Sequence, residues 1–178
     1  MSTGDLESAV QQLFPEQGKN ALAAALGIDP STLWRYAQRG RIPGPVSAAV
    51  AAWIILKRDF DLDPPALPCS TREIEELAEM ADPGVRRRSG LLGIEAAAFV
   101  VFGDGWKGRL SAALGVDYST IWRQITAGNI QGPVMAAIRA WIVLKRLGGT
   151  LPAASAESPA GGRRRPMPKY ARLLLEDE

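Results

Sequence analysis

Two stretches of this chain, DPSTLWR at residues 29–35 and DYSTIWR at residues 117–123, carry the same set of hydrogen-bonding side chains. In each stretch a serine is followed four positions later by an arginine, so on a helix the two side chains lie one turn apart on one face. Such a hydroxyl can meet a phosphate or a base edge, and such an arginine can donate to the O6 and N7 atoms of guanine together. This pattern predicts recognition of a nucleic acid.

The composition excludes several other kinds of chemistry. The 178 residues include no histidine and a single cysteine, Cys69. Zinc fingers, histidine-based acid and base catalysis, and Cys–His nucleophiles therefore lack the residues they need. A nuclease or recombinase would need clustered acids for a metal, and here the acids concentrate in a linker segment typical of a solvated helix face. We expect no catalytic residue, no bound metal and no cofactor.

Charge is distributed unevenly along the chain, although the formal net charge is only +2. Residues 1–58 hold six Lys or Arg against four acids, and residues 93–146 hold six against three. Residues 59–92, by contrast, hold eight acids and four bases. The basic excess in two separate segments is compatible with nucleic-acid binding by each of them.

Targeting and membrane signals are not apparent in the sequence. The first ten residues, MSTGDLESAV, lack the basic and apolar regions of a signal peptide. The longest uncharged apolar run covers the twelve residues 45–56, shorter than the roughly 18 that a membrane span needs. We expect a cytoplasmic, nucleoid-associated protein with no membrane partner.

An internal repeat organises the chain. Residues 18–58 align with residues 106–146 without a gap at an offset of 88, and 24 of the 41 positions are identical. Chance does not produce such a match, so the chain is a tandem duplication. The predicted organisation is a first domain over residues 1–58, a linker over 59–92, a second domain over 93–146 and a flexible tail over 147–178.

Each repeat is predicted to form four helices, which gives an all-α fold with two helix-turn-helix domains. The second helix ends at a glycine and the third begins at an aspartate, Asp29 or Asp117, which is a good N-cap. In the linker, Ser70 and Glu73 predict a capping box ahead of a short helix at about 71–81. The expected helices are 4–14, 19–26, 29–40 and 46–58 in the first repeat and 92–102, 107–114, 117–128 and 134–146 in the second.

The fourth helix of each repeat should be mostly internal. In the first repeat it is apolar nearly all round, which favours burial against the other repeat or against a second chain in a homodimer. Trp53 and Trp141 on these helices are predicted core residues.

The third helix of each repeat presents the candidate binding side chains. Trp34 and Trp122 lie away from the face of Leu33 and Ile121; packing is the commoner role of tryptophan, and contact with DNA or with a protein are the alternatives. Arg39 and Arg41 follow the third helix only in the first repeat, which should therefore hold phosphate more strongly. The predicted DNA-binding residues are Lys19, Ser31, Thr32, Trp34, Arg35, Arg39 and Arg41 in the first repeat and Lys107, Tyr118, Ser119, Thr120, Trp122, Arg123 and Asn129 in the second.

Two longer segments, KNALAAALGIDPSTLWRYAQRG and KGRLSAALGVDYSTIWRQITAG, resemble the helix-turn-helix core of the phage Cro and C1 repressor-like superfamily, which includes small prophage-encoded regulators of the YdaS kind. The resemblance covers about 55 residues of each repeat. The family usually obtains its second domain from a partner subunit, whereas this chain carries both. The resemblance implies phosphate contacts by Lys19 and Lys107 and base reading by Pro30, Ser31 and Arg35 and by Tyr118, Ser119 and Arg123, although Pro30 has no hydrogen-bonding side chain.

Two hypotheses for function follow. The preferred one is a transcription regulator that binds specific double-stranded DNA through both repeats as a tethered pseudo-dimer, with direct or inverted half-sites about one helical turn apart. The alternative is an adaptor in which one repeat binds DNA and the other binds RNA polymerase or another transcription factor. A resemblance of STIWRQITAGNIQGPV to excisionase-like winged helices would require a β-hairpin next, whereas the following MAAIRAWIVLKR is predicted to be helical.

Overall fold

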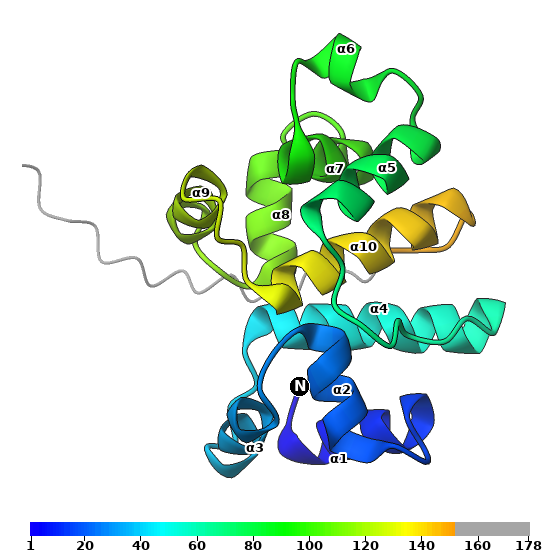
Figure 1. The fold of residues 1–178 in the computed structure, drawn as a ribbon, viewed down its shortest axis with the longest axis vertical. Helices are drawn as coiled ribbons and strands as arrows, with labels where there is room; N and C mark the ends of the chain where they lie inside the picture. The colour runs from blue at the N-terminus through cyan, green and yellow to red at the C-terminus, as the bar shows by residue number, and fades with distance from the viewer. Residues whose placement is uncertain (152–178) are drawn as a thin grey trace, which may run out of the picture.

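The computed structural model describes residues 1–151, which form ten α-helices and no strand (Figure 1). The predicted all-α fold is confirmed, and the β-hairpin of a winged helix does not follow the second repeat's third helix. None of the helices described combines the length and the apolar character needed to cross a membrane. The tail expected to be disordered lies, from residue 152 onward, outside the described residues.

Each repeat contains four helices close to the predicted bounds. The third helix begins one residue later and ends two residues earlier than expected in each repeat. The fourth helix begins two residues earlier than expected and takes a proline into its first turn. The helices of the first repeat are α1 (Thr3–Leu13), α2 (Gly18–Leu26), α3 (Pro30–Gln38) and α4 (Gly44–Phe60). The linker forms α5 (Thr71–Ala81) and the short α6 (Val85–Ser89), and the second repeat forms α7 (Gly93–Phe102), α8 (Trp106–Leu114), α9 (Tyr118–Thr126) and α10 (Gly132–Arg146).

The turn between the second and third helices has the same backbone in both repeats. Gly27 and Gly115 end α2 and α8 in the left-handed region, at φ 65° and φ 62°. Asp29 then caps α3, because its Oδ1 accepts a hydrogen bond from the backbone N–H of Ser31 at 2.8 Å. Asp117 has nearly the same backbone conformation, but its side chain makes no capping hydrogen bond, so the N-cap expected there is present only in the backbone.

The two fourth helices, α4 and α10, lie side by side at the centre of the molecule and form its most extensive helix pair (Figure 1). Trp53 and Trp141 are buried on them, at 1% and 2% exposure, as predicted. Phe14 and Phe102 meet these tryptophans edge to face in their respective repeats. Burial of the apolar α4 against the other repeat is thereby confirmed.

The contacts between the repeats are reciprocal. A Cβ atom added to Gly44 at the start of α4 would lie 2.0 Å from the carbonyl oxygen of Leu114 at the end of α8. A Cβ added to Gly132, the residue equivalent to Gly44, would lie 2.2 Å from the carbonyl oxygen of Leu26, the residue equivalent to Leu114. Reciprocal pairs of this kind are the mark of a two-fold relation, since a simple translation would not return the second contact to the first repeat. The repeats are therefore arranged as an approximate two-fold dimer within one chain.

The linker helix α5 packs on α7 and α10 of the second repeat. Its N-terminus has half of the predicted capping box: Ser70 Oγ accepts from the N–H of Glu73, while the Glu73 carboxylate pairs instead with Arg139 on α10 at 2.7 Å. The cover explains why the two first helices differ in polarity. Ala96, Phe99 and Val100 on α7 are buried or half-buried, whereas the equivalent Ser8, Gln11 and Gln12 on α1 are exposed.

Candidate nucleic-acid interface

The third helices, α3 and α9, are the candidate recognition helices. Each packs against the helix before it in the helix-turn-helix order. Leu33 and Ile121 anchor them to the core, at 1% exposure each. Helical geometry then turns the serine and arginine positions outward, and Ser31, Arg35 and their equivalents in α9 are exposed.

Each recognition arginine is oriented by a threonine of its own helix. Arg35 donates from Nη2 to Thr32 Oγ1 at 2.8 Å, and Arg123 donates from Nη2 to Thr120 Oγ1 at 3.5 Å. The Nε of Arg123 also donates to the backbone oxygen of Ser119 at 3.3 Å. The sequence suggested a serine–arginine pair acting on a ligand; in the structure threonine holds the guanidinium, and the serine hydroxyls are left exposed beside it.

The two recognition helices lie on the same side of the α4–α10 pair, at the N-terminal ends of these helices (Figure 1). This placement follows from the approximate two-fold relation, whose axis runs between α4 and α10. One surface of the molecule therefore carries Arg35 and Arg123 together. A long, regular polyanion could contact both.

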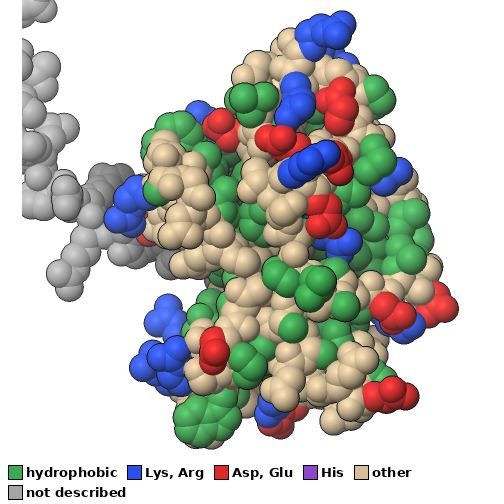
Figure 2. Space-filling view, viewed as in Figure 1, with side chains coloured by type: hydrophobic (Ala, Val, Ile, Leu, Met, Phe, Trp, Pro, Cys, Tyr) green, Lys and Arg blue, Asp and Glu red, His purple; other side chains and the backbone are tan. Residues whose placement is uncertain are grey.

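Basic side chains project from this surface. Figure 2 shows blue side chains at the left, near α3 and near α9, with a few red side chains close by, while blue and red side chains are intermixed over α5 and α6. Arg39 and Arg41, just after α3, are exposed and form no ion pair with any of the residues described. The second repeat has Ala127 and the exposed Asn129 at these positions. The positive charge near the centre of the surface thus comes from the first repeat.

The lysines predicted to contact phosphate have different environments. Lys19 Nζ lies 2.9 Å from Glu7 Oε1, with both side chains about half exposed. An exposed pair of this kind contributes only about 0–1 kcal/mol, so a phosphate could replace the carboxylate at little cost. Lys107 has no carboxylate partner among the described residues and sits instead over aromatic rings.

The aromatic cluster of the second repeat consists of Trp106, Tyr118 and Trp122. Lys107 Nζ lies 5.6, 5.8 and 5.6 Å from the centroids of these three rings, a distance at which the negative ring faces attract a cation. Tyr118 and Trp122 stack, with centroids 6.1 Å apart and planes at 28°. The hydroxyl of Tyr118 is enclosed and has no hydrogen-bond partner among the described residues, so in this conformation Tyr118 positions Trp122 and Lys107 and offers no donor to a ligand.

The packing role considered for the recognition-helix tryptophans is wrong for Trp34. It is 59% exposed, because Gly18 and Pro30 stand where the second repeat has Trp106 and Tyr118. Trp122 is partly packed and still 41% exposed. Each recognition helix thus leaves a large part of a tryptophan ring accessible to solvent.

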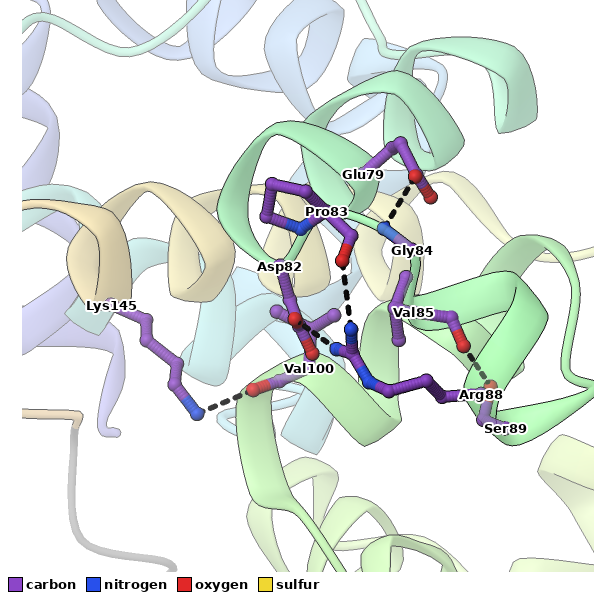
Figure 3. Close-up of polar contacts among 9 residues, drawn as sticks. All are labelled: Glu79, Asp82, Pro83, Gly84, Val85, Arg88, Ser89, Val100 and Lys145. Carbon is purple, nitrogen blue, oxygen red and sulfur yellow. Dashed lines mark hydrogen bonds and ion pairs between the residues drawn. The ribbon is translucent and has the colours of Figure 1, made fainter.

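Two other basic residues make contacts within the linker or within the second repeat (Figure 3). Arg88 on α6 donates to the carbonyl oxygen of Pro83 at 2.8 Å and pairs with Asp82. Lys145 near the end of α10 donates to the carbonyl oxygen of Val100 on α7. These cations lie away from the recognition helices, and we assign them no ligand.

No set of side chains suited to metal binding occurs in the part of the chain described. Groups of three or more His, Cys, Asp or Glu that could hold a metal are not found there. Burial, and to a lesser degree the neighbouring Glu73 carboxylate, raise the pKa of the Cys69 thiol to about 11. At neutral pH that thiol is protonated, and a protonated thiol is a poor nucleophile.

Comparison with known proteins adds no relative. The chain matches no family model, and the searches of the curated proteins and of the solved structures found no match. The resemblance to the Cro and C1 repressor-like superfamily thus stays a prediction. The surface formed by α3 and α9 is therefore the basis for a functional proposal.

Proposed function

We propose that this protein is a sequence-specific double-stranded DNA-binding regulator of transcription in which the two repeats act as the two halves of a dimer. The observation that carries the proposal is the pair of equivalent recognition helices on one surface, related by an approximate two-fold. Each presents an arginine held in place by a threonine, beside an exposed serine. B-DNA offers the matching target, because its major groove returns to the same face once per helical turn.

The two-fold relation between the repeats limits how the two DNA half-sites can be oriented. The sequence left direct and inverted half-sites open, whereas two-fold related recognition helices match inverted half-sites. With recognition helices as similar as PSTLWR and YSTIWR, the half-sites should also be similar. We therefore propose an imperfect inverted repeat, with half-site centres about 34–36 Å apart.

Roles for the individual residues follow from their positions. Arg35 and Arg123 read guanine in the major groove, with Ser31 and Ser119 beside them and Thr32 and Thr120 as positioning residues. Trp34 and Trp122 cover apolar edges such as the thymine methyl group. The phosphate contacts are assigned to Lys19, Lys107, Arg39, Arg41 and, as a neutral donor, Asn129.

The test compares specific with non-specific binding. Duplexes are first selected from a random library with the full chain, and affinities for the selected duplex and for random duplex are then measured by fluorescence anisotropy. Arg35→Ala should cost about 1–3 kcal/mol on the selected duplex and much less on random duplex, whereas Lys19→Ala should weaken both similarly. Arg58→Ala, at the far end of α4, is the control for the loss of one positive charge. Equal losses for Arg35→Ala on both duplexes would refute its base-reading role.

A second candidate, the adaptor, is favoured by one feature of the second repeat. Its Lys107 is held by Trp106, Tyr118 and Trp122, and it lacks counterparts of Arg39 and Arg41. An exposed aromatic cluster around a cation also suits a protein interface, where tryptophan, tyrosine and arginine dominate the binding energy. If Arg123→Ala leaves DNA affinity unchanged while Arg35→Ala lowers it, the second repeat contacts another partner and the adaptor replaces the pseudo-dimer.

A further inference from the structure

A cleft of about 640 Å³ lies between the two recognition helices. The end of α3, the turn that follows it and the start of α4 form one wall, and α9 with the start of α10 forms the other. Both members of two equivalent pairs line it: Tyr36 with its counterpart Gln124, and Pro43 with its counterpart Gln131. The cleft therefore lies between the two repeats, and it exists only because they are packed together.

The walls of the cleft are mostly apolar, and their charged side chains are all basic. Apolar side chains, including Ile42, Val116 and Val134, make up much of the lining, and Tyr36 and Gln124 add polar groups. The charged lining residues are Arg39 and Arg41, both without an ion-pair partner in the described chain, and none of the described residues lining the cleft is acidic. Since two unpaired guanidinium groups stand at one wall of an apolar space, the complementary guest is apolar and carries a negative group.

We propose that this cleft is a binding site for a small organic anion, with an aromatic or aliphatic body and one carboxylate, sulfonate or phosphate group. Its volume falls within the range of about 300–1,000 Å³ typical of small-molecule sites, which are mostly apolar with a few placed polar groups and often lie between domains. Arginine binds such anionic groups through two parallel hydrogen bonds. The apolar body would lie against Ile42, Val116 and Val134 while the anionic group meets Arg39 and Arg41.

An anion bound in the cleft should affect DNA binding, an inference that rests on the proposed function. The same two arginines cannot pair fully with a bound anion and with a DNA phosphate. The guest would also touch both repeats, since Thr120 and Gln124 belong to α9 and Arg39 follows α3. A bound anion should therefore weaken DNA binding, as an inducer does.

The site is tested without DNA by titrating the full chain with 1-anilinonaphthalene-8-sulfonate, an aromatic sulfonate whose fluorescence rises in apolar surroundings. We expect one saturable site per chain. The double variant Arg39→Gln with Arg41→Gln should bind the probe at least tenfold more weakly. The double variant Arg58→Gln with Arg146→Gln removes the same charge from exposed positions at the other end of α4 and α10, and it should bind as the wild type does.

Gln124→Glu gives a second test that leaves both arginines in place. Gln124 Oε1 accepts from the N–H of Gln131 at 3.3 Å, and a glutamate of the same shape retains that bond. It adds a negative charge to the opposite wall, so the probe should bind at least tenfold more weakly. Multiple weak sites, no binding, or equal losses in the two double-arginine variants would overturn the site.

Competition separates this inference from the proposed function. The probe should displace selected duplex from the wild type and much less from the Arg39 and Arg41 double variant. Probe binding by a chain that ignores DNA would leave the site standing and refute the proposed function. DNA binding by a chain that does not bind the probe would refute the anion site and leave the proposed function standing.

Discussion

The close approach of the two repeats makes Gly44 a sensitive test of how they are packed. The backbone of Gly44 is not in the left-handed region, so an alanine can adopt its conformation within α4. Its Cβ would nevertheless lie 2.0 Å from the carbonyl oxygen of Leu114, and ordinary contacts begin at 3.4 Å. The repeats would have to separate there by about 1.4 Å, the difference between the two distances. Both partners are backbone, so no side-chain rotation can relieve the overlap.

The expected size of the effect follows from this overlap. Overpacking in a well-packed interior costs about 1–3 kcal/mol, and each kcal/mol lowers the melting temperature by about 2–4 °C in a chain of this length. Gly132→Ala should behave alike, because its Cβ would lie 2.2 Å from the carbonyl oxygen of Leu26. Thermal unfolding followed by far-ultraviolet circular dichroism measures both.

Gly4→Ala is the matched control. Gly4 lies in α1, and the nearest atom to its added Cβ is Ser2 Oγ at 3.9 Å. Alanine there should be neutral or stabilising by up to about 1 kcal/mol, since alanine loses less backbone entropy than glycine in a helix. If Gly44→Ala melts at the same temperature as Gly4→Ala, the packing of α4 against the second repeat is wrong, and the two-fold arrangement is wrong with it.

The remaining predictions concern two side chains, Asp29 and Cys69. Asp29→Ala should lower the melting temperature more than Asp117→Ala, because only the Asp29 side chain caps its helix. The hydrogen bond to Ser31 lowers the pKa of the Asp29 carboxyl, so the stability that the cap contributes is present above the pKa of this carboxyl in the unfolded chain and is lost as the pH falls. Equal effects of the two variants at neutral pH would contradict the capping difference. Cys69 should react with iodoacetamide at pH 8 about a hundredfold more slowly in the folded chain than in urea, because burial raises its pKa from 9.0 to about 11. The same shift, upward on folding, predicts stability that is intact below about pH 9 and falls as the pH rises toward 11, and a Cys69→Ala variant should lack that fall.

Local elements of the fold could be predicted because each leaves its signal within a few residues. The glycine and aspartate of LGID and LGVD mark the end of one helix and the start of the next, and apolar spacing marks the buried face. The short α6 could not be predicted, since five residues between Gly84 and Gly90 are too few to show a period. The close approach of Gly44 to Leu114 depends on how two distant segments pack, which no local pattern records.

The candidate site was predictable in its positions and less so in its interactions. The repeat itself pointed to Arg35 and Arg123, whereas the threonine that orients each arginine is found only from rotamer geometry. The aromatic cluster around Lys107 did leave a signal. Trp106 and Tyr118 stand where the first repeat has Gly18 and Pro30. The positions at which the two repeats differ therefore point to the aromatic cluster, as the identical positions point to the arginines.

The symmetry of the selected DNA site is the measurement that tests the central claim most directly. Duplexes enriched from a random library by the full chain, sequenced and then footprinted with hydroxyl radicals, report the number, orientation and spacing of the half-sites. We expect two similar half-sites in inverted orientation, with centres about one helical turn apart, protected on one face of the duplex. Half-sites in direct orientation, a single half-site, or no enrichment at low salt would contradict it.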